Sequence, residues 1–323
     1  MEIDLESFEF FTFAKKLATM SLLTVGTVAF DDIKTPFGHA EKVVGGACTY
    51  ASWSASYFTN DIRLVSIVGD DFPSDEIDLL HKRGVKTEGL EIVEDKKSFF
   101  WAGEYHDNMN QRTTLATELN VLADFDPILP DSYKNSQYIM LGNLTPAIQM
   151  QTLKQLNGDP KLVVMDTMNF WMDVAMDELK EVIKHVDVIT INDEEARQLS
   201  GEYALVSAAM KIHEMGPKFV VIKKGEHGAL LFSEGKIFSA PALPMARVMD
   251  PTGAGDTFAG GFIGYLAKSD DISFENMKRA IIYGSVMASF CVEEFSIEKL
   301  KTLDENQIHA RVNQFVDIAH FNM

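Results

Sequence analysis

The most regular feature of this sequence is a series of short apolar segments, separated by stretches long enough to be helices. These segments cover residues 138–141, 162–165, 188–191 and 219–222. Strands that are apolar on both faces are typical of parallel sheets, because helices cover such sheets on either side. The pattern therefore predicts βαβ units and an α/β fold with a mainly parallel central sheet.

Polar residues follow each of these predicted strands. In chain order they include Asn143, Asp166 and Asn169, Asn192 and Glu195, and Lys223 and Lys224 with Gly225. The carboxyl ends of parallel strands meet at one edge of a sheet, where α/β proteins bind their ligands. The convergence of these polar strand ends predicts an active site at that edge.

Residues 21–30 form another apolar, β-branched run, which we expect to be one buried strand that ends at Asp31 and Asp32. A carboxylate at the end of such a strand would lie at the ligand edge. We expect Asp31 to face the ligand and Asp32 to be solvated or to cap the turn, although the sequence leaves the opposite assignment open.

A short segment, 33–44, then leads to Gly45 and Gly46, a pair that permits close backbone approach or a hinge. We expect a helix from residue 47 to about 58 and a second buried strand at 63–68.

Residues 97–115 alternate weakly and are rich in aromatic and β-branched side chains, which predicts a hairpin. Its aromatic residues could stack on a base, or could pack within the hairpin or against a second subunit. Residues 1–20 predict an N-terminal helix or extension with an aromatic face. Without a repeat or linker in the sequence, we expect residues 1–323 to form a single domain.

The chain of 323 residues is 46% hydrophobic, which is enough for a buried core. Its 29 Lys and Arg against 48 Asp and Glu give a formal charge of −19, which disfavours binding to a nucleic acid polymer. No apolar run is long enough for a membrane span, and the acidic N-terminus does not fit a targeting segment. Cys48 and Cys291 lack metal-ligand spacing, so we expect buried thiols in a cytoplasmic protein.

The residues that bear most directly on chemistry are the string D-P-T-G-A-G-D-T-F-A-G-G-F, from Asp250 onward. It predicts a loop that runs into a helix, where the small residues Gly253, Ala254 and Gly255 leave N–H groups free at the positive end of the helix dipole. Asp256, in the first turn, could take a proton from a hydroxyl that attacks a phosphoryl group held on those N–H groups. This arrangement suggests phosphoryl transfer.

The whole string resembles the C-terminal signature of the ribokinase-like (PfkB-type) carbohydrate and nucleoside kinases. The resemblance implies that Asp256 is the catalytic base, that Gly253, Ala254 and Gly255 form the anion hole, and that Thr252 contacts the nucleotide. It also implies a three-layer αβα, Rossmann-like (ribokinase-like) fold with a small β lid, which residues 34–45 and 97–116 would form here.

Other positions resemble the family's substrate site. The spacing from Gly26 to Asp31 matches a Gly and an Asp that holds substrate hydroxyls, and Gly45 with Gly46 matches a pair between base and lid. The Asn that usually follows this pair is absent, and Tyr50 takes its place, which puts the identity of the substrate in doubt. Arg112 is the most attractive lid cation for a ligand, or else a surface charge.

Asn192 and Glu195 resemble the family's N-x-x-E element, which helps to hold magnesium, mainly through water. Alone, they would equally fit the start of a helix with acidic residues in its first turn. Lys224 and Gly225 resemble a turn beside the triphosphate, where Lys224 is either a phosphate contact or a solvated charge. Asp166 and Asn169 resemble a D-x-N element, which suggests hydrogen bonding near substrate or phosphate.

Together these features predict an ATP-dependent, Mg²⁺-requiring kinase that phosphorylates a hydroxyl of a small sugar or polyol. A nucleoside kinase of the same family is the alternative, and a catalytically silent ligand-binding protein on the same fold is the alternative from another class. The resemblance leaves open a monovalent cation and a homodimer formed through the lid.

Overall fold

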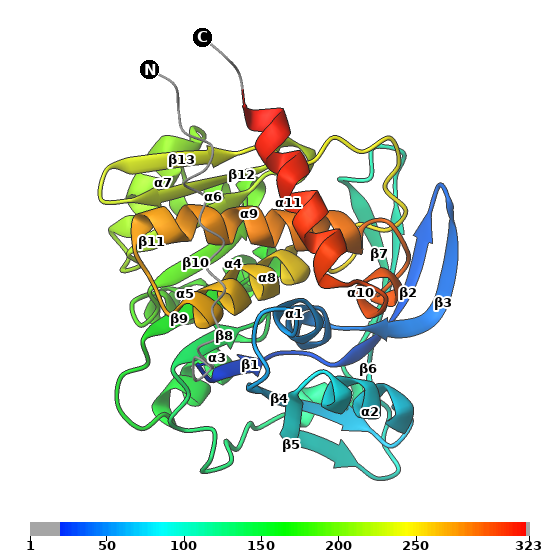
Figure 1. The fold of residues 1–323 in the computed structure, drawn as a ribbon. Helices are drawn as coiled ribbons and strands as arrows, with labels where there is room; N and C mark the ends of the chain where they lie inside the picture. Colours follow the sequence, from blue (N-terminus) through cyan, green and yellow to red (C-terminus); the bar gives the residue numbers. More distant parts are fainter. Residues whose placement is uncertain (1–19, 321–323) are drawn as a thin grey trace, which may run out of the picture.

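The computed structural model describes residues 20–320, so the predicted N-terminal element lies, except for its last residue, outside the described part of the chain. Two sheets organise this structure, a large one at its centre and a small one at its side (Figure 1). The large sheet has the order β13-β12-β11-β10-β9-β8-β1-β4-β5, and the small sheet has the order β3-β2-β6-β7.

The large sheet is parallel from β5 to β11, and β12 and β13 are antiparallel additions at one edge. Its strands are β1 (Leu22–Val25), β4 (Ile62–Gly69), β5 (Val85–Val93), β8 (Tyr138–Leu141), β9 (Leu162–Asp166), β10 (Val188–Asn192), β11 (Phe219–Lys223), β12 (Ala229–Ser233) and β13 (Lys236–Ala240). The four strands predicted between residues 138 and 222 are therefore confirmed, and three of them are one residue longer than expected.

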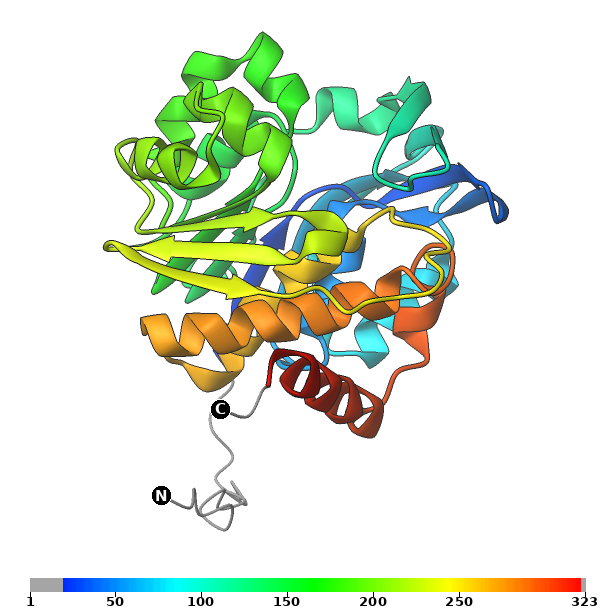
Figure 2. The same cartoon turned by 90° about the horizontal axis from the view of Figure 1, so that it is seen from above.

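Helices cover both faces of this sheet, and Figure 2 shows the three layers from above. One face packs against α1 (Ala47–Ala55), α2 (Ser74–Lys82), α8 (Ala254–Ser269) and α9 (Phe274–Cys291), followed by α10 (Glu298–Lys301) and α11 (Glu305–Ala319). The other face packs against α3 (Pro146–Lys154), α4 (Asn169–Val174), α5 (Met176–Ile183), α6 (Asp193–Ser200) and α7 (Leu205–His213). The predicted three-layer α/β fold is confirmed.

Alternation along the strands divides the core between these two faces. In β8, Tyr138 and Met140 pack on the α8 side, whereas Ile139 and Leu141 pack on the other side. Successive side chains of a strand point to opposite faces, so a strand buried on both sides must be apolar throughout. This is why the central strands stand out so clearly in the sequence.

The prediction of one strand over residues 21–30 is wrong. The chain leaves the large sheet after β1, passes through Gly26, and enters the small sheet as β2 (Ala29–Thr35). Asp31 therefore lies inside a strand of the small sheet and not beyond the end of a central strand. An uninterrupted apolar run conceals such a change of sheet, because both strands are buried at this point.

The small sheet, called the lid below, contains most of residues 34–45 and 97–116, which we expected to form a lid, and it begins earlier, at Ala29. Besides β2, it contains β3 (Gly38–Gly45), β6 (Phe99–Tyr105) and β7 (Arg112–Glu118). The antiparallel pairs β2–β3 and β6–β7 are two hairpins, joined by the parallel pairing of β2 with β6. The lid stands beside the carboxyl ends of the central strands (Figure 1). Short 3₁₀ turns, η2 (Asn120–Asp124) and η3 (Gly225–His227), complete the described elements.

No helix within residues 20–320 is both long enough and apolar enough to cross a membrane.

Candidate active site

The polar strand ends converge, as predicted, on the edge of the large sheet that the lid faces. The chain runs outward from the middle of this sheet in two directions, because β1 lies between β4 and β8. Such a reversal opens a crevice at the carboxyl ends of the strands. Helix α8 begins at the same edge and is tied to α1 by a hydrogen bond from the Ser54 hydroxyl to the Thr257 carbonyl, 2.7 Å.

The loop before α8, the expected anion cradle, differs from the expectation at one of its N–H groups. Gly253 is the N-cap residue and has a φ of 71°, a left-handed conformation that favours glycine. The Gly255 N–H donates to no other residue between 20 and 320 and is free for a ligand. The Ala254 N–H, which we expected to be free as well, donates instead to the Pro251 carbonyl, 3.2 Å. This bond closes the turn that leads into the helix.

Asp256 lies in the first turn of α8, as predicted. Burial, and then the nearby Asp166 carboxylate, raises the pKa of Asp256 to about 7, while the positive charges of Lys223 and Arg112 act in the opposite direction. A base for a sugar hydroxyl is most effective when its pKa lies near the working pH. The position and environment of Asp256 therefore suit proton abstraction.

Asp31 is a buried carboxylate at this edge and is 5% exposed. It accepts a hydrogen bond from the Gly46 N–H, and a side chain at Gly45 would come within 1.9 Å of its carboxylate oxygen. The glycine pair thus makes room for Asp31. Burial, followed by the charges of Asp250 and Asp256, raises the pKa of Asp31 to about 8.

Asp32 points away from this site and accepts a hydrogen bond from, or ion-pairs with, His39 at 2.7 Å. Adjacent residues of a strand face opposite sides, so only one of the two aspartates can reach the ligand. Burial marks Asp31 as the inward one.

Two tyrosines line the space between Asp31 and the cradle. The Tyr50 ring packs so closely on Gly253 that a Cβ there would lie 2.4 Å from three ring carbons. Its hydroxyl is buried and makes no hydrogen bond within residues 20–320. The Tyr105 hydroxyl accepts a hydrogen bond from the Thr252 hydroxyl, 3.2 Å, which joins the lid to the cradle loop.

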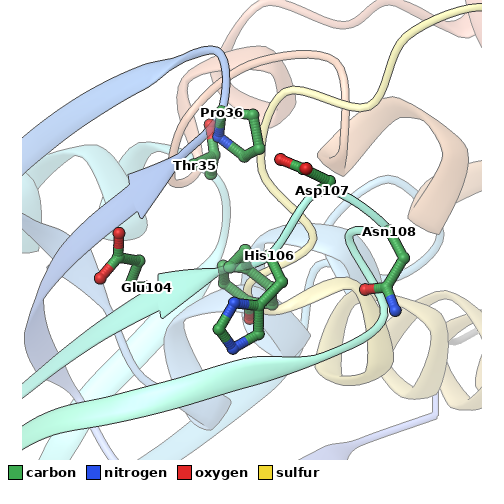
Figure 3. Close-up of a pocket in the computed structure, with 7 residues that line it drawn as sticks. Thr35, Pro36, Glu104, His106, Asp107 and Asn108 are labelled. Atoms are coloured by element: carbon green, nitrogen blue, oxygen red, sulfur yellow. The ribbon is translucent and has the colours of Figure 1, made fainter.

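A pocket of about 470 Å³ opens beside Tyr105 in the lid. Its walls come from both hairpins of the lid, and in Figure 3 the turn of Thr35 and Pro36 faces Asp107 across the opening. Glu104, His106 and Asn108 complete its mainly polar lining. The pocket suits a ligand with several hydrogen-bonding groups.

The predicted magnesium residues lie where β10 turns into α6, and they form a capping box. The Asn192 side chain accepts from the Glu195 N–H, and the Glu195 carboxylate accepts from the Asn192 N–H, both at 2.8 Å. The helix-start alternative is therefore realised, and it leaves the second carboxylate oxygen of Glu195 for a ligand. Burial, and then Asp166, raises the pKa of Glu195 to about 7. Residues 20–320 contain no cluster of three or more His, Cys, Asp or Glu that could hold a bare metal ion.

The remaining predicted residues differ in how closely they approach the site. Arg112, on β7, lies 5.7 Å from the Trp101 ring centre, and its charge acts on both Asp256 and Glu195. Gly225 faces the tip of the lid, where the Asn110 amide oxygen lies 3.1 Å from the position of a Cβ. Lys224 is half-buried in the same turn. Asn169 is exposed at the start of α4, and its side chain forms no hydrogen bond inside the described range.

Lys223, which the sequence placed among the polar strand ends without giving it a role, ends β11 and points into the site. Its ammonium donates to Asp166 at 2.7 Å, across the intervening strand β10. The resemblance suggested a phosphate contact for Lys224, as one of two alternatives, and none for Lys223. The useful signal was the position of Lys223 as the last residue of an apolar parallel strand, directly before a glycine turn.

Comparison with known proteins extends these findings. The profile of the pfkB family carbohydrate kinases matches residues 14–301. The chain is 29% identical over 250 residues to a cytidine kinase of Thermococcus kodakarensis, covering 76% of this chain and 87% of that protein. It is 25% identical over 289 residues to a nucleoside kinase of Methanothermobacter thermautotrophicus, covering 84% and 89%.

Among solved structures, the fold matches that of a candidate ribokinase II from E. coli in complex with ATP and Mg²⁺. The TM-score is 0.76 with 18% identity, and the match covers 91% of this chain and 99% of that one. At this level of identity the match speaks for the fold alone.

Proposed function

The chain belongs to the pfkB family of carbohydrate kinases, and on that premise we propose that it transfers the γ-phosphoryl group of ATP to a hydroxyl of a nucleoside. One observation carries this proposal most strongly. The half-buried Asp256 carboxylate lies in the first turn of α8, next to the unpaired Gly255 N–H. A base and an anion-binding donor are thus adjacent, as the transfer requires.

In the proposed reaction, Asp256 accepts the proton of the attacking hydroxyl. The bond from that oxygen to phosphorus forms as the bond from phosphorus to the ADP oxygen breaks, and ADP leaves with the electron pair. The Gly255 N–H stabilises negative charge on the transferred group, helped by the dipole of α8. Gly253 and Ala254 shape the loop that presents this donor.

Asp31 is the proposed anchor for the acceptor. A carboxylate can accept hydrogen bonds from two neighbouring hydroxyls at once, such as those of a ribose ring. Gly45 and Gly46 keep Asp31 in place, Tyr50 packs beneath the acceptor against the cradle, and Arg112 closes over it from the lid.

Thr252 and Gly225 lie on the side of the cradle where we place the nucleotide. The Lys224 side chain has no polar partner within residues 20–320, and we assign it to the solvated-charge alternative. The oxygen donors of Asn192 and Glu195 fit a hydrated Mg²⁺ held through water, since hard cations of this size keep much of their water shell. Bound there, the ion would neutralise phosphate charge.

Two acceptor classes compete. Among the relatives matched over most of the chain, a cytidine kinase and a nucleoside kinase favour a nucleoside. A 1-phosphofructokinase of Haloferax volcanii, 27% identical over 255 residues and matched over 73% of this chain, favours the sugar that the sequence suggested. The 470 Å³ pocket in the lid includes neither Asp31 nor the cradle loop in its lining, so it does not decide between the two classes. Trp101 does not decide between them, because its ring packs on Gly103 within β6 and not toward the site.

Release of ADP from Mg-ATP, measured with cytidine, other nucleosides, ribose and polyols as separate acceptors, tests the proposal. We expect the highest kcat/KM with a nucleoside. A preference for ribose or a polyol would instead support the sugar kinase, and no stimulation by any acceptor would support the ligand-binding alternative.

Two further predictions belong to the same assay and sample. Replacing K⁺ by tetramethylammonium measures whether a monovalent cation stimulates turnover. The molar mass in solution, with and without charged substitutions at the exposed lid residues Leu115 and Leu119, measures whether two copies pair through the lid.

A further inference from the structure

Lys223 is a partly buried cation that the proposed reaction has not yet used. It is the last residue of β11 and stands opposite Asn192 in the neighbouring strand. Its side chain is 16% exposed, and its ammonium donates to Asp166 at 2.7 Å. Burial opposes the charge, but the Asp166 and Glu195 carboxylates hold the pKa of Lys223 above its usual range. The side chain is therefore a permanent ammonium.

Asp166 is itself held firmly. One of its carboxylate oxygens accepts from the Thr167 N–H at 2.8 Å, and the other accepts from the Thr190 hydroxyl at 3.2 Å. The residue lies at the carboxyl end of β9 and is 5% exposed. A carboxylate fixed in this way fixes the ammonium that it binds, so Lys223 is oriented before any ligand arrives.

The ammonium lies against the anion cradle. A Cβ at Gly255 would be 3.1 Å from the Lys223 nitrogen, so the cation stands directly beside the residue whose N–H is free. Its charge also acts on Asp256, one residue further along the helix. The lysine, the free N–H and the proposed base thus border the same small volume.

An ammonium has three N–H donors, and Lys223 uses one. Its other two donors make no hydrogen bond to any residue of the range 20–320. Because the side chain is only 16% exposed, water reaches these two donors poorly, and they remain available to a ligand at the cradle. Two free donors beside a phosphate cradle point to an oxygen-rich anion as the missing partner.

We propose that Lys223 donates a hydrogen bond to a non-bridging oxygen of the phosphoryl group in transit, and that Asp166 positions it for this contact. This role rests on the proposed function. Lys223 keeps its proton throughout, while the proton of the acceptor passes to Asp256 and the phosphorus–oxygen bond to ADP breaks. The lysine would be a catalytic residue and Asp166 a positioning residue.

Lys224 offers a matched control. It is the next residue, carries the same charge and is half-buried, yet its side chain has no polar partner in the described structure. Its backbone N–H donates to the Gly228 carbonyl at 2.7 Å, which a change of side chain would leave intact. A general loss of positive charge near the site would therefore affect Lys223→Met and Lys224→Met alike.

The first measurement compares the steady-state constants of these two variants with those of the wild type. We expect Lys223→Met to lower kcat by about 10²- to 10³-fold with an ATP dissociation constant changed by less than about threefold, as for other donors aimed at developing charge. Lys224→Met should keep kcat within about threefold. Retention of more than a fifth of kcat by a folded Lys223→Met would overturn the proposal.

If Lys223→Met fails to fold, the double variant Asp166→Asn with Lys223→Met removes both charges and avoids an unpaired buried carboxylate, a change that proteins tolerate better than a broken pair. It should fold and still lack turnover. A folded double variant with wild-type kcat would refute the role of Lys223.

The second measurement needs no acceptor. Binding of ADP with Mg²⁺ and tetrafluoroaluminate mimics the transferred phosphoryl group, and we expect Lys223→Met to weaken it about 10²-fold while leaving ADP binding alone unchanged. A wild type that binds the mimic tightly but phosphorylates no acceptor would refute the proposed function and leave Lys223 supported. Equal binding of the mimic by variant and wild type, with nucleoside phosphorylation intact in both, would refute only the role of Lys223.

Discussion

The buried carboxylates in the two halves of the active-site crevice differ in whether they have an ion-pair partner. On the lid side, Asp31 is buried beside Asp250 and forms no ion pair within the described residues. On the side of β9 to β11, Asp166 is equally buried but is paired with Lys223 at 2.7 Å. The same residue type is thus left without a cation in one half and neutralised in the other.

This difference follows from what each half would bind. An unpaired carboxylate is an acceptor that lacks donors, and hydroxyl groups of an alcohol supply them. A paired carboxylate with spare ammonium donors balances an incoming anion. The crevice therefore has two poles. Asp31 forms one, which accepts hydrogen bonds from hydroxyl groups, and Lys223 with Asp166 forms the other, which binds negative charge. Asp256 lies between them.

The largest effect should come from the residue between the poles. Asp256→Asn removes the base and hardly changes volume, so we expect kcat to fall by about 10³-fold or more, with folding and ATP binding largely intact. Steady-state kinetics and ATP titration measure both quantities. A loss of less than tenfold would rule out Asp256 as the essential base.

The next largest effect should come from Asp31, the pole that accepts hydrogen bonds from hydroxyl groups. Asp31→Ala should lower kcat/KM for the acceptor by about 10²-fold through a higher KM, because a charged hydrogen-bond partner is lost, while the KM for ATP moves little. Asp32→Ala is the control, since that side chain pairs with His39. If the two variants exchange these outcomes, the acceptor is held by Asp32.

The two poles should also respond oppositely in stability without ligand. The hydroxyl donors of a bound acceptor would favour the charged carboxylate of Asp31. Without ligand, burial raises the pKa of Asp31 to about 8 and so favours the protonated form in the folded protein below that pH, whereas the unfolded chain releases the proton near pH 4. The contribution of this raised pKa is therefore full below pH 4 and is lost as the pH rises to 8. Asp31→Asn should raise the free energy of unfolding at pH 8 by about 1 to 3 kcal/mol, with little effect at pH 4.

Asp166→Asn, in contrast, leaves the Lys223 ammonium without its partner and should lower the free energy of unfolding by about 2 to 4 kcal/mol. Urea denaturation of both variants at pH 4 and pH 8 measures the pair of effects. If both substitutions change the free energy of unfolding at pH 8 in the same direction, the two halves do not differ in the way proposed.

The smallest effect should appear at the proposed magnesium position. Glu195→Gln keeps the capping box, because glutamine can make the same contact with the Asn192 N–H, but it loses the negative charge. We expect half-maximal activity to require a roughly threefold to tenfold higher Mg²⁺ concentration, at an almost unchanged melting temperature. An unchanged Mg²⁺ titration would remove Glu195 from the metal site.

The parts of the fold that could be predicted are those where burial alone determines which residue types occur. Strands such as β8 are buried on both faces, so their apolar runs have clear ends. The run from residue 21 to 30 is equally apolar but serves two sheets, and no residue type marks the passage through Gly26. Topology, and not local preference, decides where that strand ends.

The residues of the site also divide into those that could be predicted from the sequence and those that could not. Asp256 could be located because the cradle motif is local in sequence. Lys223 could be placed at a strand end, but its role could not be predicted, because that role depends on Asp166, 57 residues earlier, and on a helix that begins 31 residues later. The Ala254 N–H was misjudged for a different reason: whether it points outward depends on how tightly the turn at Pro251 closes.

The most direct test of this account is a crystal structure with the acceptor, Mg²⁺ and a non-hydrolysable ATP analogue bound together. We predict an acceptor hydroxyl within about 2.6 to 3.2 Å of the Asp256 carboxylate, two neighbouring hydroxyls on Asp31, and the γ-phosphate against the Gly255 N–H and Lys223. An acceptor whose hydroxyls all lie out of reach of both aspartates, or a triphosphate on the Asp31 side, would contradict the account.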